Sequence, residues 1–182
     1  HRMHFVDEGP VDRQPVVMVH GNPTWSFYYR ELIRGLENEF RCLAPDHVGM
    51  GLSDRPADRD YDYTLATRMA DFGHWMDAIE PERAVDFVVH DWGGAIALSW
   101  AVRNPERVRR LVVLNTWAFM IPDDAALPRS LAFARTPLGG LLIKGFNAFS
   151  GIAVRVATEK KLDPAVARGL TAPYRGGPSR RL

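Results

Sequence analysis

The chain has 182 residues, of which 46% are hydrophobic and 25% are charged. These fractions are typical of an ordinary globular domain and exclude a disordered chain or a collagen-like repeat. Lys and Arg number 23 against 22 Asp and Glu, so no overall basic charge favours binding to nucleic acid.

Short β-branched runs alternate with longer segments of helical periodicity in the first two thirds of the chain. Apolar and alternating runs predict an exposed strand at 2–6 and further strands at 16–19, 41–44, 86–89 and 111–114. Of these, the strands at 16–19, 86–89 and 111–114 are expected to be buried. Helical spacing predicts helices at 25–36, at 65–79 after a Thr64 N-cap, and at 95–102. This alternation is typical of βαβ crossovers, so we predict an α/β fold with a mostly parallel sheet covered by helices on both faces.

The pattern changes after Thr116. Residues 117–182 contain no convincing strand, several helix-like patches and frequent proline and glycine. We therefore assign residues 1–116 to the α/β core and 117–182 to a helical insertion that lies where the loops of the sheet converge. The alternative is a packed helical tail unrelated to any site.

The most specific motif is VVHDWGG at 88–94, at the junction of a predicted strand and helix. A nucleophile elbow needs small residues two and three positions after the nucleophile, because the helix must start directly against the strand. Gly93 and Gly94 meet this need, and Asp91 stands where a serine esterase has serine. Val89 departs from the pattern, which has glycine two residues before the nucleophile. We predict Asp91 as a nucleophile; a simple helix N-cap is the alternative.

A second motif, HGNPTWS at 20–26, directly follows the predicted strand at 16–19. In folds with a nucleophile elbow, the loop after that strand supplies further oxyanion donors. Asn22 offers a backbone N–H and a side-chain amide, and Trp92 adds an indole N–H beside Asp91. We predict that Asn22 and Trp92 hold an oxyanion or a halide. Their plainer roles are a turn residue before Pro23 and a core aromatic.

Nothing in the sequence indicates a metal ion or another cofactor. Asp46 and Asp54 lie in a glycine-containing loop at 46–63 that we interpret as a structural turn rather than a metal site. No glycine-rich loop has the spacing that cradles phosphate, which argues against a nucleotide.

The single cysteine and the absence of a long apolar run predict a cytoplasmic location. Cys42 is the only cysteine, so an internal disulfide is excluded and a reducing compartment is expected. No apolar stretch reaches the ~20 residues of a membrane span. The first residues have neither the charged head nor the apolar core of a signal peptide.

Three motifs make the chain resemble the haloalkane-dehalogenase-like branch of the α/β-hydrolase superfamily: HGNPTW at 20–25, PDHVGMGLSD at 45–54 and HDWGG at 90–94. Within that branch the likeness is closest to the β-lactone decarboxylases of bacterial long-chain olefin biosynthesis. This closer likeness rests on FYYR at 27–30, YDYTL at 61–65, LVVLNT at 111–116, RTPLG at 135–139, GFNAF at 145–149 and APY at 172–174. Together the motifs cover essentially the whole chain.

The resemblance implies a role for each matching residue. Asp91 matches the nucleophile, and Asn22 with Trp92 matches the pair that stabilises the leaving anion or oxyanion. Residues 117–182 match the first part of a helical cap whose apolar face would line a channel for alkyl chains. Asn115 stands where many dehalogenases of one subgroup carry a catalytic glutamate. The family also suggests an association with other olefin-biosynthesis enzymes.

Both ends of the chain look cut in comparison with that family. The start matches the second strand of the fold, and residues 178–182 fall inside the cap. The family's general-base histidine and its supporting acid lie after the final strands, and none of the 6 histidines here stands at a triad position. We therefore expect an incomplete fold without its C-terminal strands, and a chain that is inactive by itself because no base activates water.

The leading hypothesis is a fragment of a β-lactone decarboxylase. In it, Asp91 attacks a strained lactone with two alkyl chains, and a cis alkene and carbon dioxide are formed. A carboxylate suits this reaction, because it is a nucleophile without deprotonation at neutral pH. The alternative is a haloalkane dehalogenase, in which Asp91 displaces halide and water cleaves the alkyl ester. An epoxide hydrolase and a non-catalytic relic or binding domain are weaker alternatives. The expected partner is a small hydrophobic substrate.

Overall fold

The computed structural model describes residues 1–79, 83–117, 136, 138, 148–156 and 158–174. It divides into two compact units, His1–Ala118 and Phe119–Leu182. Much of the predicted cap, including most of its motifs at 135–139 and 145–149, lies outside the described residues.

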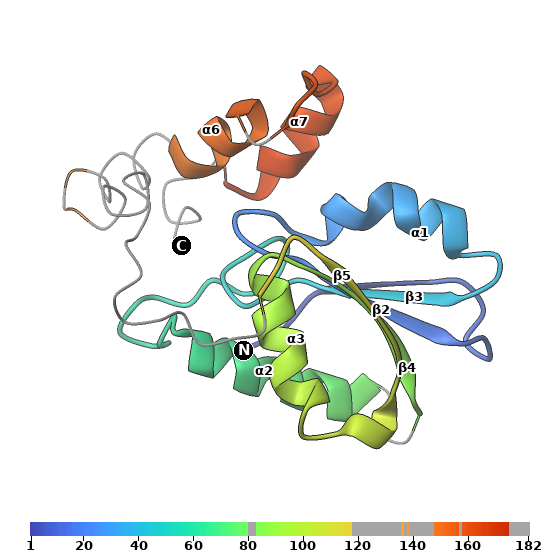
Figure 1. Ribbon diagram of the computed structural model, residues 1–182. Coiled ribbons are helices and arrows are strands. Elements are labelled where there is room, and N and C mark those ends of the chain that lie inside the picture. The colour runs from blue at the N-terminus through green and yellow to red at the C-terminus, as the bar shows by residue number, and fades with distance from the viewer. Residues whose placement is uncertain (80–82, 118–135, 137, 139–147, 157, 175–182) are drawn as a thin grey trace. The chain divides into compact units, whose positions relative to one another are not determined.

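A five-stranded sheet forms the centre of the first unit (Figure 1). Its strands are β1 (Phe5–Glu8), β2 (Pro15–Val19), β3 (Arg41–Pro45), β4 (Val85–His90) and β5 (Val108–Leu114). They lie in the order β1-β3-β2-β4-β5, with β1 antiparallel to β3 and every other pair parallel. The predicted mostly parallel sheet is therefore confirmed. The first strand begins at Phe5, three residues later than predicted, and continues to Glu8.

Helices cover both faces of this sheet, as predicted. They are the 3-10 helix η1 (Ser26–Tyr29), α1 (Arg30–Leu36), α2 (Leu65–Ile79), α3 (Trp92–Ala101) and the 3-10 helix η2 (Pro105–Arg107). The segment predicted as one helix at 25–36 is thus a 3-10 turn followed by a short α-helix. α3 starts at Trp92, three residues earlier than predicted. The sequence pattern misses this first turn because it contains two glycines, which have poor helix propensity.

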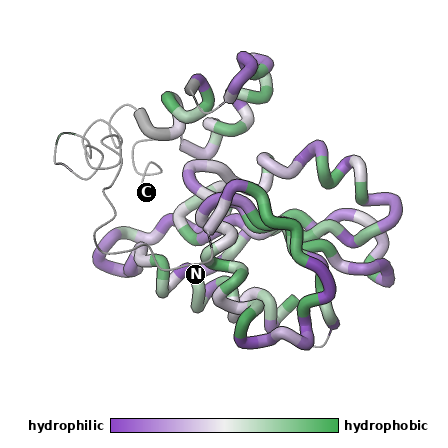
Figure 2. The backbone as a smooth tube through the Cα atoms, viewed as in Figure 1, coloured by the Kyte–Doolittle hydropathy of each residue, from purple (hydrophilic) through white to green (hydrophobic). Residues whose placement is uncertain are grey.

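The alternation of side chains along β2 divides the core into two clusters. Val17 and Val19 are fully buried against α2 and α3, on the face that also holds Trp100. Val16 and Met18 point to the opposite face and pack in the cluster that includes Ile33 of α1. Figure 2 shows hydrophobic residues concentrated along the strands between these helices. A strand buried on both faces explains the continuous apolar run at 16–19.

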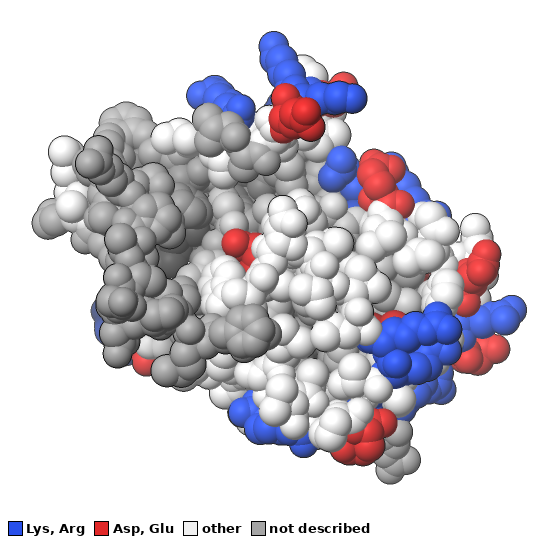
Figure 3. Space-filling view, in the orientation of Figure 1, with Lys and Arg blue, Asp and Glu red and all other residues white. Residues whose placement is uncertain are grey.

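β5 differs from the buried strand that the sequence predicts. Its four consecutive apolar residues are 41%, 49%, 51% and 39% exposed, in the order Leu111, Val112, Val113 and Leu114. The cause is position, because β5 is the outermost strand and pairs only with β4 among the described residues. Figure 3 shows mostly uncharged side chains over the described part of this face, with an acidic group near its middle and most Lys and Arg toward the rim.

The second unit contains only helices among its described residues. These are α6 (Ala148–Val156), α7 (Pro164–Thr171) and the 3-10 helix η3 (Ala172–Tyr174). α7 has proline in its first turn, and its Asp163 N-cap accepts the Ala165 N–H at 2.6 Å. Across the described parts of both units, no helix is long and apolar enough to cross a membrane.

Candidate active site

Asp91 occupies a strained turn between β4 and α3. Its backbone has φ 53° and ψ −134°, a region that is costly for a residue with a side chain and that recurs at functional sites. Asp91 stands at the N-cap position of α3, yet its side chain makes no capping hydrogen bond. Its Oδ1 instead accepts the backbone N–H of Asn22 at 2.9 Å. The plain N-cap role therefore does not describe this carboxylate.

Three glycines allow the backbone segments around Asp91 to approach each other. A Cβ on Gly93 would overlap the carbonyl of Val19 in β2. A Cβ on Gly94 would overlap the side chain of Thr116, and one on Gly21 would overlap the Asp91 carboxylate. The elbow motif thus has a steric reason at both glycines that follow Asp91. Gly21 fills the same role from the opposite loop.

The Asn22 N–H is aimed by the peptide group to which it belongs. The Gly21 carbonyl accepts three hydrogen bonds, from the Thr24 N–H at 3.0 Å, the Thr24 hydroxyl at 2.9 Å and the His20 Nδ1–H at 3.0 Å. In a trans peptide the C=O and the following N–H point in opposite directions. Fixing the carbonyl of Gly21 therefore directs the Asn22 N–H toward Asp91.

Asn22 and Trp92 each carry a further side-chain N–H donor. Among the described residues, neither the Asn22 side-chain amide nor the Trp92 indole N–H has a hydrogen-bond partner. The Trp92 ring packs edge-on against Trp117, with centroids 4.9 Å apart. The structure brings the Asn22 backbone to Asp91, and Trp92 is its chain neighbour. Binding of an anion by the two side chains stays a prediction.

Tyr28 and His90 flank Asp91, and the sequence assigned neither a role at the site. Their rings stack, with centroids 4.8 Å apart and planes at 18°. Burial lowers the pKa of His90, and the negative charge of Asp91 opposes this shift only in part. Burial and the same charge raise the pKa of Tyr28, so its phenol keeps its proton. The FYYR motif at 27–30 was the one sequence signal for Tyr28.

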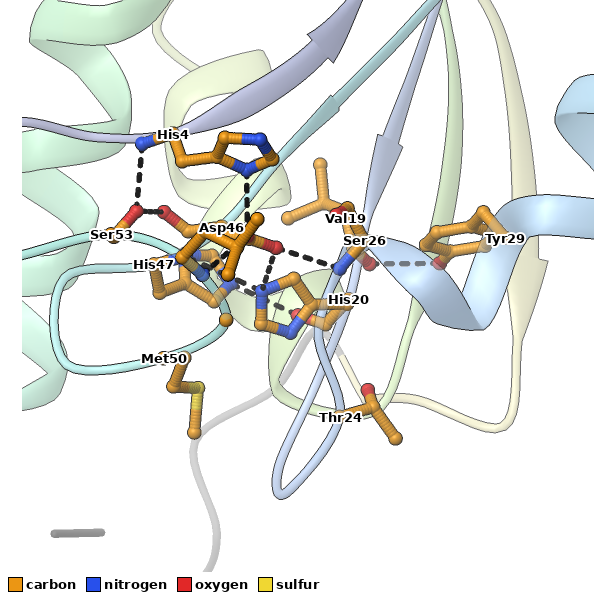
Figure 4. Close-up of polar contacts among 12 residues, drawn as sticks. His4, Val19, His20, Thr24, Ser26, Tyr29, Asp46, His47, Met50 and Ser53 are labelled. Atoms are coloured by element: carbon orange, nitrogen blue, oxygen red, sulfur yellow. Dashed lines mark hydrogen bonds and ion pairs between the residues drawn. The ribbon is translucent and has the colours of Figure 1, made fainter. Parts of the chain in front are cut away.

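A buried carboxylate, Asp46, connects three segments of the first unit (Figure 4). Its Oδ1 accepts the Ser26 N–H at 2.7 Å. Its Oδ2 accepts the Leu52 N–H at 2.9 Å and lies 2.8 Å from His4 Nδ1. Gly51 has φ 52°, and a Cβ there would overlap this carboxylate. The contacts fit the predicted structural turn, and the described residues contain no group of three potential metal ligands.

His20 joins this cluster to the Asn22 loop as a neutral ring. The His47 N–H donates to His20 Nε2 at 3.3 Å, so that nitrogen carries a lone pair and Nδ1 carries the proton. The His47 Nε2–H donates to the His20 carbonyl at 2.9 Å. Burial lowers the pKa of both imidazoles. The 3.9 Å approach of His20 Nε2 to Asp46 Oδ1 is therefore not an ion pair.

Known proteins share this architecture and parts of the sequence. A family model described as alpha/beta hydrolase fold matches residues 14–135. A cis-3-alkyl-4-alkyloxetan-2-one decarboxylase of Shewanella oneidensis is 46% identical over 175 residues, which cover 95% of this chain and 54% of that protein. A haloalkane dehalogenase of Mycobacterium marinum is 37% identical over 179 residues, which cover 95% of this chain and 56% of that protein.

Solved structures give the same picture of the fold. A haloalkane dehalogenase from Agrobacterium tumefaciens superposes with a TM-score of 0.84 at 31% identity, covering 98% of this chain and 60% of the other. The chain spans about half the length of the curated relatives it matches, 54% and 56% in the two cases above.

Proposed function

Because the chain belongs to the α/β-hydrolase family, we propose that it carries the nucleophile and anion-binding residues of a β-lactone decarboxylase. One observation carries this proposal: a carboxylate, Asp91, stands on a strained strand-to-helix turn with one oxygen on the Asn22 N–H. The decarboxylase relative at 46% identity is more similar to this chain than the dehalogenase relative at 37%.

The two oxygens of Asp91 have different roles in this proposal. Oδ1 is held by the Asn22 N–H, so Oδ2 is the oxygen available for attack. Oδ2 forms a bond to the ring carbon that bears oxygen, the ring C–O bond breaks, and the substrate is left as a free carboxylate on an alkyl ester of Asp91. The Asn22 amide and the Trp92 indole would stabilise that departing oxygen as it gains charge.

The second step returns Asp91 to its starting state. The substrate carboxylate loses carbon dioxide, its C–C bonding pair forms the double bond, and the ester C–O bond breaks toward Asp91. Inversion at the first step followed by anti elimination converts a cis-substituted lactone into a cis alkene. Neither step consumes water, so this route needs no base to activate water. The expectation that the chain is inactive by itself therefore applies to the hydrolytic route and not to this one.

Hydrolytic dehalogenation is the second candidate, and the likeness to solved dehalogenases favours it. The same Oδ2 would displace halide from an alkyl carbon, with Asn22 and Trp92 holding the halide. Water must then cleave the ester, which needs a base. A chain without that base would stop as an alkyl ester on Asp91. The two candidates therefore differ in the species that accumulates.

The proposal extends to the parts that surround the site. Residues 117–182 would form the first part of a helical cap over a channel for alkyl chains, and the core would comprise residues 1–116. We place the protein in the cytoplasm with a small hydrophobic substrate, and we regard the chain as part of a longer enzyme.

The test presents a dialkyl β-lactone and a long 1-haloalkane to the purified chain in separate reactions. Gas chromatography measures alkene, an ion-selective electrode measures halide, and intact-protein mass spectrometry measures covalent adducts. Alkene formation that is lost in Asp91→Asn supports the decarboxylase, whereas a stable adduct on Asp91 with halide release supports the dehalogenase. The Cys42 thiol should react little with either substrate and so add few adducts of its own, because it is fully buried and burial raises its pKa to about 11. Neither product nor adduct, or equal results with Asp91→Asn, contradicts both.

A further inference from the structure

We propose that Thr116 is a positioning residue, whose hydroxyl holds Asp91 in the backbone conformation that presents its carboxylate. The inference rests on the proposed function, since it assigns Asp91 as the nucleophile. Thr116 follows β5 and lies 25 residues from Asp91 in sequence. Neither the elbow motif nor the Asn22 loop includes it.

The argument starts from the two peptide groups on either side of the Asp91 Cα. The Asp91 N–H donates to the Asn115 carbonyl at 3.3 Å. The Asp91 carbonyl accepts the Thr116 hydroxyl at 2.5 Å. The angles φ and ψ are the rotations of these two peptide planes about the Cα. Residues 115 and 116 engage both planes, so together they restrain φ and ψ and with them the direction of the Asp91 side chain.

The hydroxyl of Thr116 is not needed to satisfy the first turn of α3. The Asp91 carbonyl already accepts the Gly94 N–H at 3.0 Å, within the helix. The Thr116 bond is an additional one to the same oxygen, and it comes from the segment that follows β5. A group that restrains the strained residue from outside the helix has a positioning role that helix capping does not explain.

The neighbouring residues are shaped for this contact. A Cβ on Gly94 would lie 2.6 Å from both Cβ and Cγ2 of Thr116, so glycine at 94 admits the threonine. Asn115 adopts φ 38°, which turns the chain after β5. Asn115 and Asp91 are the two non-glycine residues with positive φ among those described, and they are joined by a hydrogen bond.

Loss of the Thr116 hydroxyl should therefore loosen the contact between Asp91 Oδ1 and the Asn22 N–H. A displacement of about 1 Å in a reacting group can cost on the order of a hundredfold in rate. Because one of several restraints is removed, we expect a roughly tenfold loss in Thr116→Val, which keeps the shape of the side chain. Thr116→Ser keeps the hydroxyl and should restore the rate to near that of the natural chain.

Two measurements test the proposal on the full chain. The first is the rate of alkene formation or of Asp91 labelling with the β-lactone and the haloalkane. The second is hydrogen exchange of the Asn22 amide by NMR, which reports its bond to Asp91 without any reaction. Thr171→Val is the matched control, because the Thr171 hydroxyl also donates to a backbone carbonyl, that of Ala167 at 2.9 Å.

The proposal expects faster exchange at Asn22 and a roughly tenfold slower reaction in Thr116→Val, with Thr116→Ser and Thr171→Val close to the natural chain. Unchanged exchange and rate in a folded Thr116→Val overturn it. If the natural chain gives neither product nor label, the proposed function fails, and exchange at Asn22 still decides whether Thr116 positions Asp91. Thr116→Ala, which has no γ atoms to crowd Gly94, replaces the valine variant if that variant does not fold.

Discussion

Replacement of Gly93 by alanine should be among the most destabilising single-methyl changes in this chain. The added Cβ would overlap the Val19 carbonyl and lie 2.6 Å from the His20 carbonyl oxygen. Both obstacles are backbone, and Val19 is fully buried in a strand that is paired on both sides. Overpacking typically costs about 1–3 kcal/mol, and a rigid obstacle places Gly93→Ala near 3 kcal/mol.

Gly35→Ala is the matched control, because it adds the same methyl group to an exposed position of α1. No atom lies within 4 Å of the added Cβ. Alanine is the better helix former, so this change should stabilise by about 0.5–1 kcal/mol. The two variants should then differ by roughly 4 kcal/mol in free energy of unfolding, measured by urea titration with circular dichroism. A Gly93→Ala chain within about 0.5 kcal/mol of the natural one would refute the close approach of α3 to β2.

Three further predictions concern the polar residues around the site. Asp46→Asn should destabilise by about 3 kcal/mol, because an amide NH₂ replaces an oxygen that faces N–H donors. Asp62→Asn at an exposed position should leave the urea midpoint unchanged, and equal effects of the two changes would contradict the role of Asp46. Burial lowers the pKa of His20 and His47 in the folded state, so below pH ~6.5 the unfolded chain binds protons that the folded chain does not. Stability should therefore fall as the pH drops from about 7.5 to about 5.5, by up to about 1.4 kcal/mol per pH unit for each histidine, and equal urea midpoints at the two pH values would disprove this. Thr24→Val removes one of three donors to the Gly21 carbonyl and should slow reaction at Asp91 about fivefold, with recovery in Thr24→Ser; an unchanged rate would show that the other two donors suffice.

Local sequence patterns predicted the parts of the fold that depend on local chemistry. The apolar run at 16–19 and the helical spacing at 65–79 correspond to β2 and α2. Burial of β5 was wrong, because an apolar run does not reveal whether a strand has neighbours on both sides. The predicted start of α3 was wrong, because Gly93 and Gly94 have poor helix propensity although they lie in the first turn. The position of that turn is set by contacts with β2 and Thr116, which propensity does not report.

The candidate site was predictable where its geometry is encoded in adjacent residues. The glycines after Asp91 predicted the elbow, which the structure shows, while the chemical role of Asp91 stays a prediction. The contacts of Asp46 with His4 and of Thr116 with Asp91 span 42 and 25 residues. No periodicity or motif reports such pairs, because they arise only when separate strands are brought together. These long-range polar contacts are therefore known only from the structure and could not be predicted from the sequence.

The restraint on Asp91 also has a thermodynamic consequence. Residues 115 and 116 continue from β5, which has the most exposed apolar residues of the five strands. Segments with few buried contacts open at a lower free energy than the core. Opening of β5 would release both peptide groups of Asp91 while β2, β3 and β4 stay paired. Any ligand, chain segment or subunit that covers β5 would therefore raise this local opening free energy, and with it the fraction of molecules whose nucleophile is aligned, without touching Asp91.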